Sequence, residues 1–156
     1  MGLEDDIAFF ERVPLLAMLG RPALRIIAIG AESHRVQSGA VLFYAGDLAD
    51  SGYIIQEGAF LLEPGTPVEG DEITAGPGTL LGELAMLTDT VRPATATALE
   101  PSTVIRISRS LFLRMLESYP VAARKLRDIM AQRIDQWTRE LANVRRVLDP
   151  GAERPR

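Results

Sequence analysis

The sequence has no cysteine, one histidine and no long apolar segment. The absence of cysteine from all 156 residues excludes disulfides, a thiol nucleophile and thiolate-bound zinc or iron–sulfur clusters. Because His34 is the only histidine, a multi-histidine metal site cannot be built, and we expect no enzyme and no metal or cofactor. No stretch approaches the ~20 apolar residues that span a bilayer, and the acidic N-terminus lacks a secretory signal pattern. These absences predict a cytoplasmic protein without a membrane partner.

Positive charge is scarce in the first two thirds of the chain. Residues 1–100 hold 15 acidic and 5 basic residues, whereas residues 101–156 hold 6 acidic and 12 basic residues. The whole chain carries a formal charge of −4, and an acidic chain is a poor nucleic-acid binder by itself. We interpret the basic final third as a solvated helix face of mixed charge. The composition therefore predicts no nucleic-acid binding by this chain alone.

The chain reads as one domain, residues 1–148, with a mainly β centre flanked by helices. Residues 4–32 show helical spacing that is divided by two prolines, Pro14 and Pro22, each suited to the first turn of a helix. The centre, residues 34–107, consists of short apolar runs punctuated by glycine, which is typical of a sandwich, barrel or roll. Strands are predicted at residues 34–37, 41–44, 53–56, 59–63, 72–74, 94–99 and 103–107.

The helical period returns over residues 110–148. Ser108 or Ser110 can cap a short helix over residues 110–117, and Pro120 can open a longer one that ends near Leu148. Residues 149–156 are predicted to be a tail. Along the longer helix, apolar residues recur at steps of 4, 3, 4, 3 and 4, which is a heptad seam: Met130, Ile134, Trp137, Leu141, Val144 and Leu148. The seam predicts a homodimer through helix 120–148, and the alternative is packing on the helix's own domain.

Gly82 and Arg92 outline a site for an anion. Gly82 precedes a helix-prone run, residues 83–87, where the backbone can approach a ligand closely and the first N–H groups favour an anion. Arg92 is the only cation between Arg35 and Arg106, an interval that holds ten acidic residues. A guanidinium can bind two phosphate oxygens at once, so the pair is interpreted as a phosphate site.

Two short motifs resemble the phosphate-binding segment of cyclic nucleotide-binding domains, as in the cAMP receptor protein family and kinase regulatory subunits. One is Gly82-Glu83-Leu84-Ala85 and the other is Arg92-Pro93-Ala94-Thr95, separated by the family's usual gap. Upstream, the runs 39–47 and 53–58 resemble the strands and turns of the family's β-roll. The resemblance covers roughly residues 7–147.

The resemblance implies an eight-stranded, jelly-roll-like β-roll with N-terminal helices and a long C-terminal helix. It also implies a ligand-sensing regulatory role in which Glu83 holds the ribose 2′-hydroxyl, Arg92 neutralises the cyclic phosphate, and amides near Gly82, Leu84 and Ala85 complete the cradle. The C-terminal helix would close over the base, and the base-contacting region falls near Arg133, Trp137 and Thr138. Trp137 could stack on a purine, or it could contribute only to packing along the heptad seam.

Pro93 departs from the family pattern. The family usually has a small residue there whose N–H contacts the phosphate, and proline has no N–H. Proline also lacks the hydroxyl that some relatives use to favour guanine, so cAMP is expected over cGMP. The alternative is a degenerate domain that binds no nucleotide, pairs Arg92 with Glu83 and acts as a protein-interaction module. The chain ends at Arg156 without the DNA-binding domain of the family's transcription factors, so a DNA-binding role is not expected.

Overall fold

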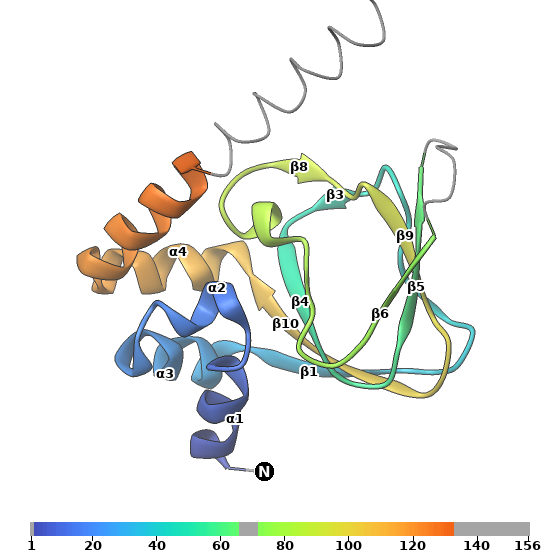
Figure 1. Cartoon of the computed structure of the whole chain (residues 1–156), viewed down its shortest axis with the longest axis horizontal. Coiled ribbons are helices and arrows are strands. Elements are labelled where there is room, and N and C mark those ends of the chain that lie inside the picture. Colours follow the sequence, from blue (N-terminus) through green and yellow to red (C-terminus); the bar gives the residue numbers. More distant parts are fainter. Residues whose placement is uncertain (1, 66–71, 133–156) are drawn as a thin grey trace, which may run out of the picture.

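The computed structural model describes residues 2–65 and 72–132. Within them, a layer of helices packs against one side of a β-roll, with the helices at the left of Figure 1 and the roll at the right. The elements, in chain order, are α1 (Leu3–Phe10), α2 (Pro14–Ala17), α3 (Arg21–Gly30), β1 (Glu32–Val36), β2 (Val41–Phe43), β3 (Leu48–Ala49), β4 (Ser51–Glu57), β5 (Phe60–Pro64), β6 (Ile73–Ala75), β7 (Leu80–Leu81), the 3₁₀ helix η1 (Glu83–Met86), β8 (Thr90–Val91), β9 (Ala94–Ala98), β10 (Ser102–Ser108) and α4 (Arg109–Ser118). Residues 120–132 form a further helix.

The strands of the roll pair antiparallel in two main sheets and one short ribbon. One sheet has the order β1-β10-β4-β7, the other has the order β2-β9-β5-β6, and β3 pairs with β8. The β3–β8 ribbon joins the two sheets at the end of the roll where η1 lies (Figure 1). This arrangement confirms the expected mainly β fold with flanking helices.

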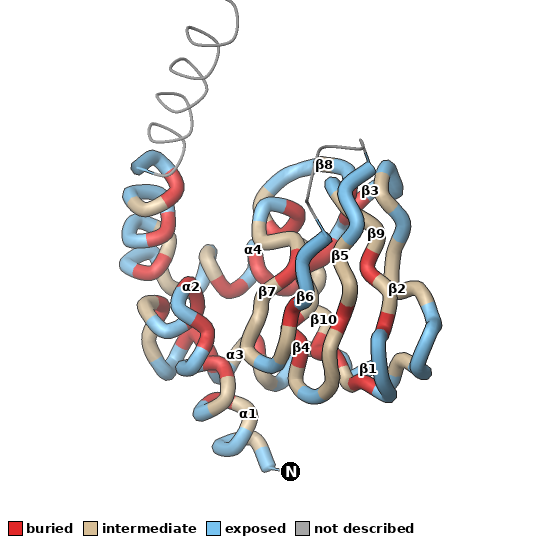
Figure 2. Tube along the Cα trace, turned by 45° about the vertical axis from the view of Figure 1, so that its right-hand side comes forward, coloured by how far each residue is buried: buried red, intermediate tan, exposed pale blue. Residues whose placement is uncertain are grey.

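The middle parts of β4 and β10 are buried on both faces of their sheet. Successive side chains of a strand point to opposite faces, so Ile54 joins the core beneath the helices, whereas Ile55 faces the interior of the roll. Neither residue is exposed to solvent. Figure 2 shows the resulting buried segments both in the helical layer and along the strands. This double burial accounts for the adjacent apolar residues in the middle of each strand, Ile54-Ile55 in β4 and Val104-Ile105 in β10.

The helices follow the sequence predictions closely. Pro14 and Pro22 lie in the first turns of α2 and α3. Ser108 caps α4, because its hydroxyl oxygen accepts a hydrogen bond of 3.2 Å from the Leu111 N–H. The longer helix begins at Pro120 as expected, whereas its predicted extension to Leu148 lies beyond residue 132, outside the described residues.

The strand count differs from the expectation of eight. All seven strands located from the sequence are present, with ends shifted by a few residues, but the described residues contain ten strands. The three additional ones are β3, β7 and β8, each two residues long. Two residues are too few to establish an alternating pattern, so these strands have no sequence signature.

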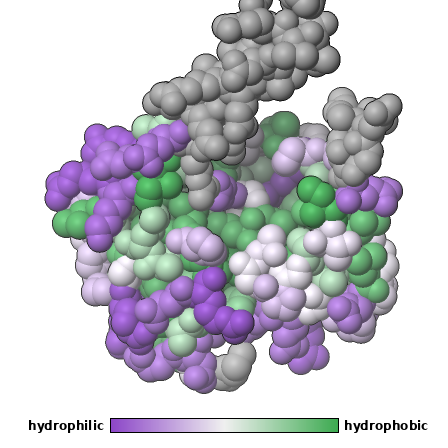
Figure 3. Space-filling model, in the orientation of Figure 1, coloured by the Kyte–Doolittle hydropathy of each residue, from purple (hydrophilic) through white to green (hydrophobic). Residues whose placement is uncertain are grey.

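The surface contains both polar and apolar areas. Figure 3 shows hydrophilic side chains over the helices at the left of the view and hydrophobic side chains in the middle of this face. Among residues 2–65 and 72–132, no helix has the length and apolar character that a membrane crossing requires.

Candidate functional site

A tight turn at Gly82 connects β7 to η1. Gly82 has φ +79° and ψ +41°, a left-handed conformation that costs a residue with a Cβ atom about 1–2 kcal/mol. The turn is closed by a hydrogen bond of 3.1 Å from the Ala85 N–H to the Gly82 carbonyl oxygen. Ala85 and Met86 are buried beneath the turn, so η1 is anchored in the core while Gly82 and Glu83 lie at its outer end.

Arg92 lies opposite this turn, with its main chain fixed on both sides. Its N–H donates to the Asp47 carbonyl oxygen, and its own carbonyl oxygen accepts from the Gly46 N–H, each at 2.8 Å. These bonds tie the segment after β8 to the segment that connects β2 and β3. Arg92 is only 5% exposed, so its guanidinium is held inside the protein rather than in solvent.

The Arg92 guanidinium rests against aromatic rings. Its Cζ atom is 4.4 Å from the centre of the Phe43 ring and 5.4 Å from the centre of the Tyr53 ring. The two rings are themselves 6.0 Å apart and tilted by 36°. Phe43 is on β2 and Tyr53 is on β4, so strands of both sheets orient the cation. Such cation–π contacts contribute about 2 kcal/mol or more when they are desolvated.

The two terminal nitrogens of Arg92 have different surroundings. Nη2 donates to the hydroxyl oxygen of Ser51 at 3.3 Å, and Ser51 is fully buried. Nη1 is buried and has no hydrogen-bond partner among the described residues. It lies against Gly82, so closely that a Cβ atom at this position would collide with it. The geometry leaves a buried, positively charged donor without an acceptor among the described residues, beside a partly buried turn.

The Arg92 guanidinium stays charged although its surroundings lower its pKa. Burial lowers the pKa of Arg92, while Tyr53, Asp50 and Asp47 act in the opposite direction, and a guanidinium remains protonated in proteins at neutral pH. The Asp50 carboxylate pairs instead with Arg106, with both of its oxygens 3.3 Å from Nη2 of that residue. The Arg92 charge therefore suits an anionic ligand oxygen.

The remaining residues of the two motifs differ in their exposure. Glu83 is partly buried at the start of η1, Leu84 is 41% exposed, and Pro93 is exposed. The Ala85 N–H is the donor that closes the turn. Ala94 and Thr95 open β9, and the Thr95 hydroxyl oxygen accepts from the Ala45 N–H at 2.9 Å.

Two groups of residues differ between the sequence prediction and the structural description of the site. Arg133, Trp137 and Thr138, the predicted base-contacting residues, lie outside the described residues. Conversely, sequence reasoning gave no role to Phe43, Ser51 or Tyr53, although the first and the last lie in the runs 39–47 and 53–58 that carried the family resemblance. Ser51 and Tyr53 are two residues apart, so alternation puts them on one face of β4, but no sequence feature places that face beside Arg92.

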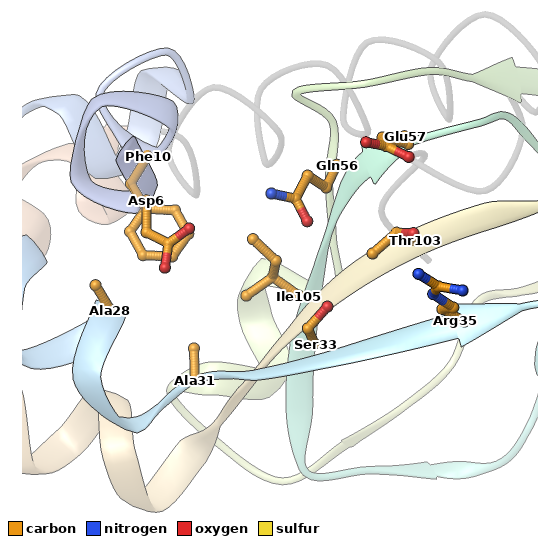
Figure 4. Close-up of a pocket in the computed structure, with 10 residues that line it drawn as sticks. All are labelled: Asp6, Phe10, Ala28, Ala31, Ser33, Arg35, Gln56, Glu57, Thr103 and Ile105. Carbon is orange, nitrogen blue, oxygen red and sulfur yellow. The ribbon is translucent and has the colours of Figure 1, made fainter. Parts of the chain in front are cut away.

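A separate pocket lies on the outer face of the β1–β10–β4 sheet, beside the N-terminal helices (Figure 4). It has a volume of about 410 Å³ and a largely polar lining that includes Asp6, Ser33, Arg35 and Glu57. Neither Arg92 nor any residue of the Gly82 turn lines it. Within the described ranges, no group of histidine and carboxylate side chains is arranged to hold a metal ion.

Comparison with known proteins places this geometry in a family. The sequence model of the cyclic nucleotide-binding domain matches residues 33–119. The chain is 32% identical over 106 residues to the cyclic AMP receptor protein of Thermus thermophilus, which covers 66% of this chain and 49% of that protein. It also spans only 22% of an uncharacterised NTE family protein of Mycobacterium bovis, at 31% identity. The chain thus spans half the length or less of these curated relatives.

Solved structures agree with the sequence match. A cyclic nucleotide-binding-like protein from Brucella abortus is similar with a TM-score of 0.63 and 41% identity, covering 72% of this chain and 98% of that chain. The N-terminal domain of a transcriptional regulator from Streptomyces coelicolor has a TM-score of 0.74 and 26% identity, covering 85% of this chain and 94% of that chain. Since the family match extends over more than half of the sequence, the chain belongs to the cyclic nucleotide-binding domain family.

Proposed function

We propose that this domain is a regulatory module that binds a cyclic nucleotide at Arg92 and the Gly82 turn, with cAMP preferred over cGMP. The observation that carries the proposal is the buried Nη1 atom of Arg92, which has no hydrogen-bond partner and lies against Gly82. A buried donor without a partner costs about 1–3 kcal/mol, and more when it is charged. A phosphate oxygen at this position removes that cost.

The other roles extend from the same position. Glu83, at the start of η1, would accept a hydrogen bond from the ribose 2′-hydroxyl, because a carboxylate is an acceptor only and cannot hold the phosphate itself. Amides at Gly82, Leu84 and Ala85 would surround the phosphate, with the Ala85 N–H shared with the Gly82 carbonyl oxygen. The preference for cAMP is supported by Pro93, which offers no hydroxyl to a guanine base.

Signalling would pass through the C-terminal helix. Ala122, Leu126 and Met130 of the helix over residues 120–132 are buried and join the core that the N-terminal helices and α4 share. A ligand that binds one placement of this helix better than another shifts the population between them. Arg133, Trp137 and Thr138 would meet the base.

The heptad seam beyond residue 132 supports a homodimer as the protein partner. Met130, the first residue of the seam, is already buried in the core of its own domain, so the predicted pairing rests on Ile134 and the residues after it. Glutamate at both Ile134 and Leu141 would bury charge in the seam and should give monomers in sedimentation velocity. A monomeric wild-type protein at high micromolar concentration would contradict the pairing.

The proposal is tested by calorimetric titration of the purified protein with cAMP, cGMP and 2′-deoxy-cAMP. We expect cAMP to bind more tightly than the other two, because cGMP finds no hydroxyl at Pro93 and the deoxy compound has no group for Glu83. A concentration of cAMP 100-fold above its dissociation constant should add about 2.7 kcal/mol to the free energy of unfolding. The absence of both heat and stabilisation would favour the alternative of an interaction module without nucleotide binding, to which the missing N–H of Pro93 points.

A further inference from the structure

The outer pocket shown in Figure 4 is one end of a longer groove. A second hollow, of about 540 Å³, adjoins it on the side of Pro101, and both hollows are lined by Arg35, Glu57 and Thr103. The groove therefore runs along the outer face of the sheet, over β10, from the N-terminal helices to the turn before that strand.

Opposite charges face each other across this groove. In the antiparallel pairing, Arg35 of β1 is opposite Thr103 of β10, which is in turn opposite Glu57 of β4. Neighbouring strands are about 4.8 Å apart, so the main chains of Arg35 and Glu57 are separated by roughly 9.6 Å. The two side chains form no ion pair with each other or with any other described residue. The row thus holds a guanidinium and a carboxylate apart, with a threonine hydroxyl between them.

A second carboxylate, that of Asp6, lies at the other end of the pocket. Asp6 is in the first turn of α1, is partly buried, and has no side-chain hydrogen bond or ion pair within the described part of the chain. Figure 4 shows Asp6 and Phe10 on one side of Ile105, and Thr103 and Arg35 on the other. Ile105 and Phe10 are 5% and 1% exposed, so an apolar floor separates this carboxylate from the charged row.

The charges indicate which ligands the groove can hold. At neutral pH it presents one positive and two negative groups. A simple anion at Arg35 would meet the Glu57 carboxylate across the row, and a simple cation at Glu57 would meet Arg35. A zwitterion satisfies both, and a further cation on its side chain satisfies Asp6. Methylene groups between the two cations would cover Ile105, and the volume of about 410 Å³ is within the usual range for small-ligand pockets.

We propose that this groove binds a basic α-amino acid, of which lysine and arginine are the common examples. The α-carboxylate accepts two hydrogen bonds from the Arg35 guanidinium. The α-ammonium donates to Glu57 and Thr103, and the side-chain cation pairs with Asp6. Each contact is near solvent and weak alone, so affinity requires all three at once. Because the groove does not include the candidate phosphate site, binding is independent of the proposed nucleotide.

The first experiment titrates the isotope-labelled protein with L-lysine and follows the amide signals by NMR. We expect a dissociation constant of about 1 mM, with shifts confined to residues 33–35, 56–57 and 103–105 and to the first turn of α1. Three truncated ligands each lack one group: norleucine has no side-chain cation, cadaverine has no carboxylate, and Nα-acetyl-lysine has no α-ammonium. Each should bind about three- to tenfold more weakly than lysine.

Variants that remove one charge assign each contact, and their spectra show whether they are folded. Asp6→Asn should weaken lysine binding to the level of norleucine and leave norleucine binding unchanged. Arg35→Gln should weaken both ligands about three- to tenfold, because both carry the carboxylate. Arg25→Gln is the matched control, since Arg25 is an exposed arginine of α3 that has no ion pair among the described residues and lines a different pocket. It should match the wild type for both ligands, and cAMP should not displace lysine.

Four results would overturn the inference. The absence of shifts with lysine up to about 30 mM would show that the groove holds only solvated charges. Equal affinity for lysine and norleucine in the wild type would remove Asp6 from the site, and unaltered binding by the Arg35→Gln variant would remove the carboxylate contact. Displacement of lysine by cAMP would place the amino acid at the Arg92 site instead. A protein that binds lysine but not cAMP would support this inference, while the proposed function would fail.

Discussion

Gly82 and Arg92 fit each other: the Nη1 nitrogen of Arg92 occupies the space that a Cβ atom on Gly82 would take. The fit explains two properties of the sequence together. The left-handed turn favours glycine for its backbone angles, and the buried guanidinium requires glycine for its lack of a side chain. The cation can therefore approach the turn backbone closely, and an anion at Nη1 would contact both.

Gly82→Ala should consequently weaken both the fold and nucleotide binding. The new Cβ atom would collide with Nη1 of Arg92 and lie 3.3 Å from the Ser51 carbonyl oxygen. We expect a loss of about 2 kcal/mol in the free energy of unfolding, because the left-handed penalty and the collision act together. Affinity for cAMP should fall at least about tenfold. Chemical denaturation and calorimetric titration measure the two effects.

Gly78→Ala is the matched control for this prediction. Gly78 also has a positive φ, +89°, but nothing lies within 4 Å of the position of its Cβ atom. The control therefore carries the backbone penalty without the collision. It should lower the free energy of unfolding by about 1–2 kcal/mol and leave cAMP affinity unchanged. Equal losses of affinity in the two variants would show that the contact between Gly82 and Arg92 does not shape the site.

Arg92→Met should abolish nucleotide binding without weakening the empty protein. Methionine fills a similar volume against Phe43 and Tyr53 but carries neither charge nor donors. Loss of the charge-assisted bonds should weaken cAMP binding by about a hundredfold or more. Removal of a buried donor without a partner offsets the lost contacts, so the midpoint of thermal unfolding should stay the same or rise. Unaltered cAMP affinity would refute the phosphate site. A large drop in the midpoint of thermal unfolding would show instead that Arg92 stabilises the fold.

The sequence identified the parts of this site that one short segment contains. Gly82 and Arg92 are ten residues apart, and their types alone indicate a tight turn and an isolated cation. The seven strands predicted from short apolar runs are also present in the structure. Residue pattern and composition are therefore sufficient to predict a structural feature when all of its residues belong to one short segment.

The surroundings of Arg92 could not be predicted because they assemble from distant strands. Phe43 on β2, Ser51 and Tyr53 on β4, and Arg92 after β8 meet only when both sheets close into a roll. The register that brings them together depends on irregular pairing, such as the shift between Val41 and Phe43 along β9.

Phe43→Leu should separate orientation of the guanidinium from its charge. Leucine retains apolar bulk but loses the ring face that lies 4.4 Å from Cζ of Arg92. We expect the free energy of unfolding to fall by about 1–2 kcal/mol, and cAMP affinity to fall about three- to tenfold because Nη1 is less well aimed. Phe60→Leu is the control, since Phe60 is fully buried in the same interior. It should destabilise the protein similarly without an effect on affinity, and a matching loss of affinity would mean that general loosening explains both.

The last prediction concerns Pro93, the position at which the chain departs from the family pattern. The carbonyl oxygen of Pro93 accepts from the Gly65 N–H at 3.1 Å, and the preceding carbonyl, that of Arg92, accepts from Gly46. Serine at this position can keep both bonds, and it adds an N–H and a hydroxyl at the residue that follows Arg92. A new charge-assisted bond contributes about 1.5–3 kcal/mol, whereas the loss of proline returns only about 0.4–1 kcal/mol of entropy to the unfolded chain. Pro93→Ser should thus bind cAMP about tenfold more tightly and be slightly less stable without ligand.

Pro93→Ala adds the N–H alone, so its affinity should match that of the serine variant for cAMP and fall below it for cGMP. If neither variant gains affinity, the missing amide does not limit binding, and the site either has another donor at this position or holds no cyclic phosphate.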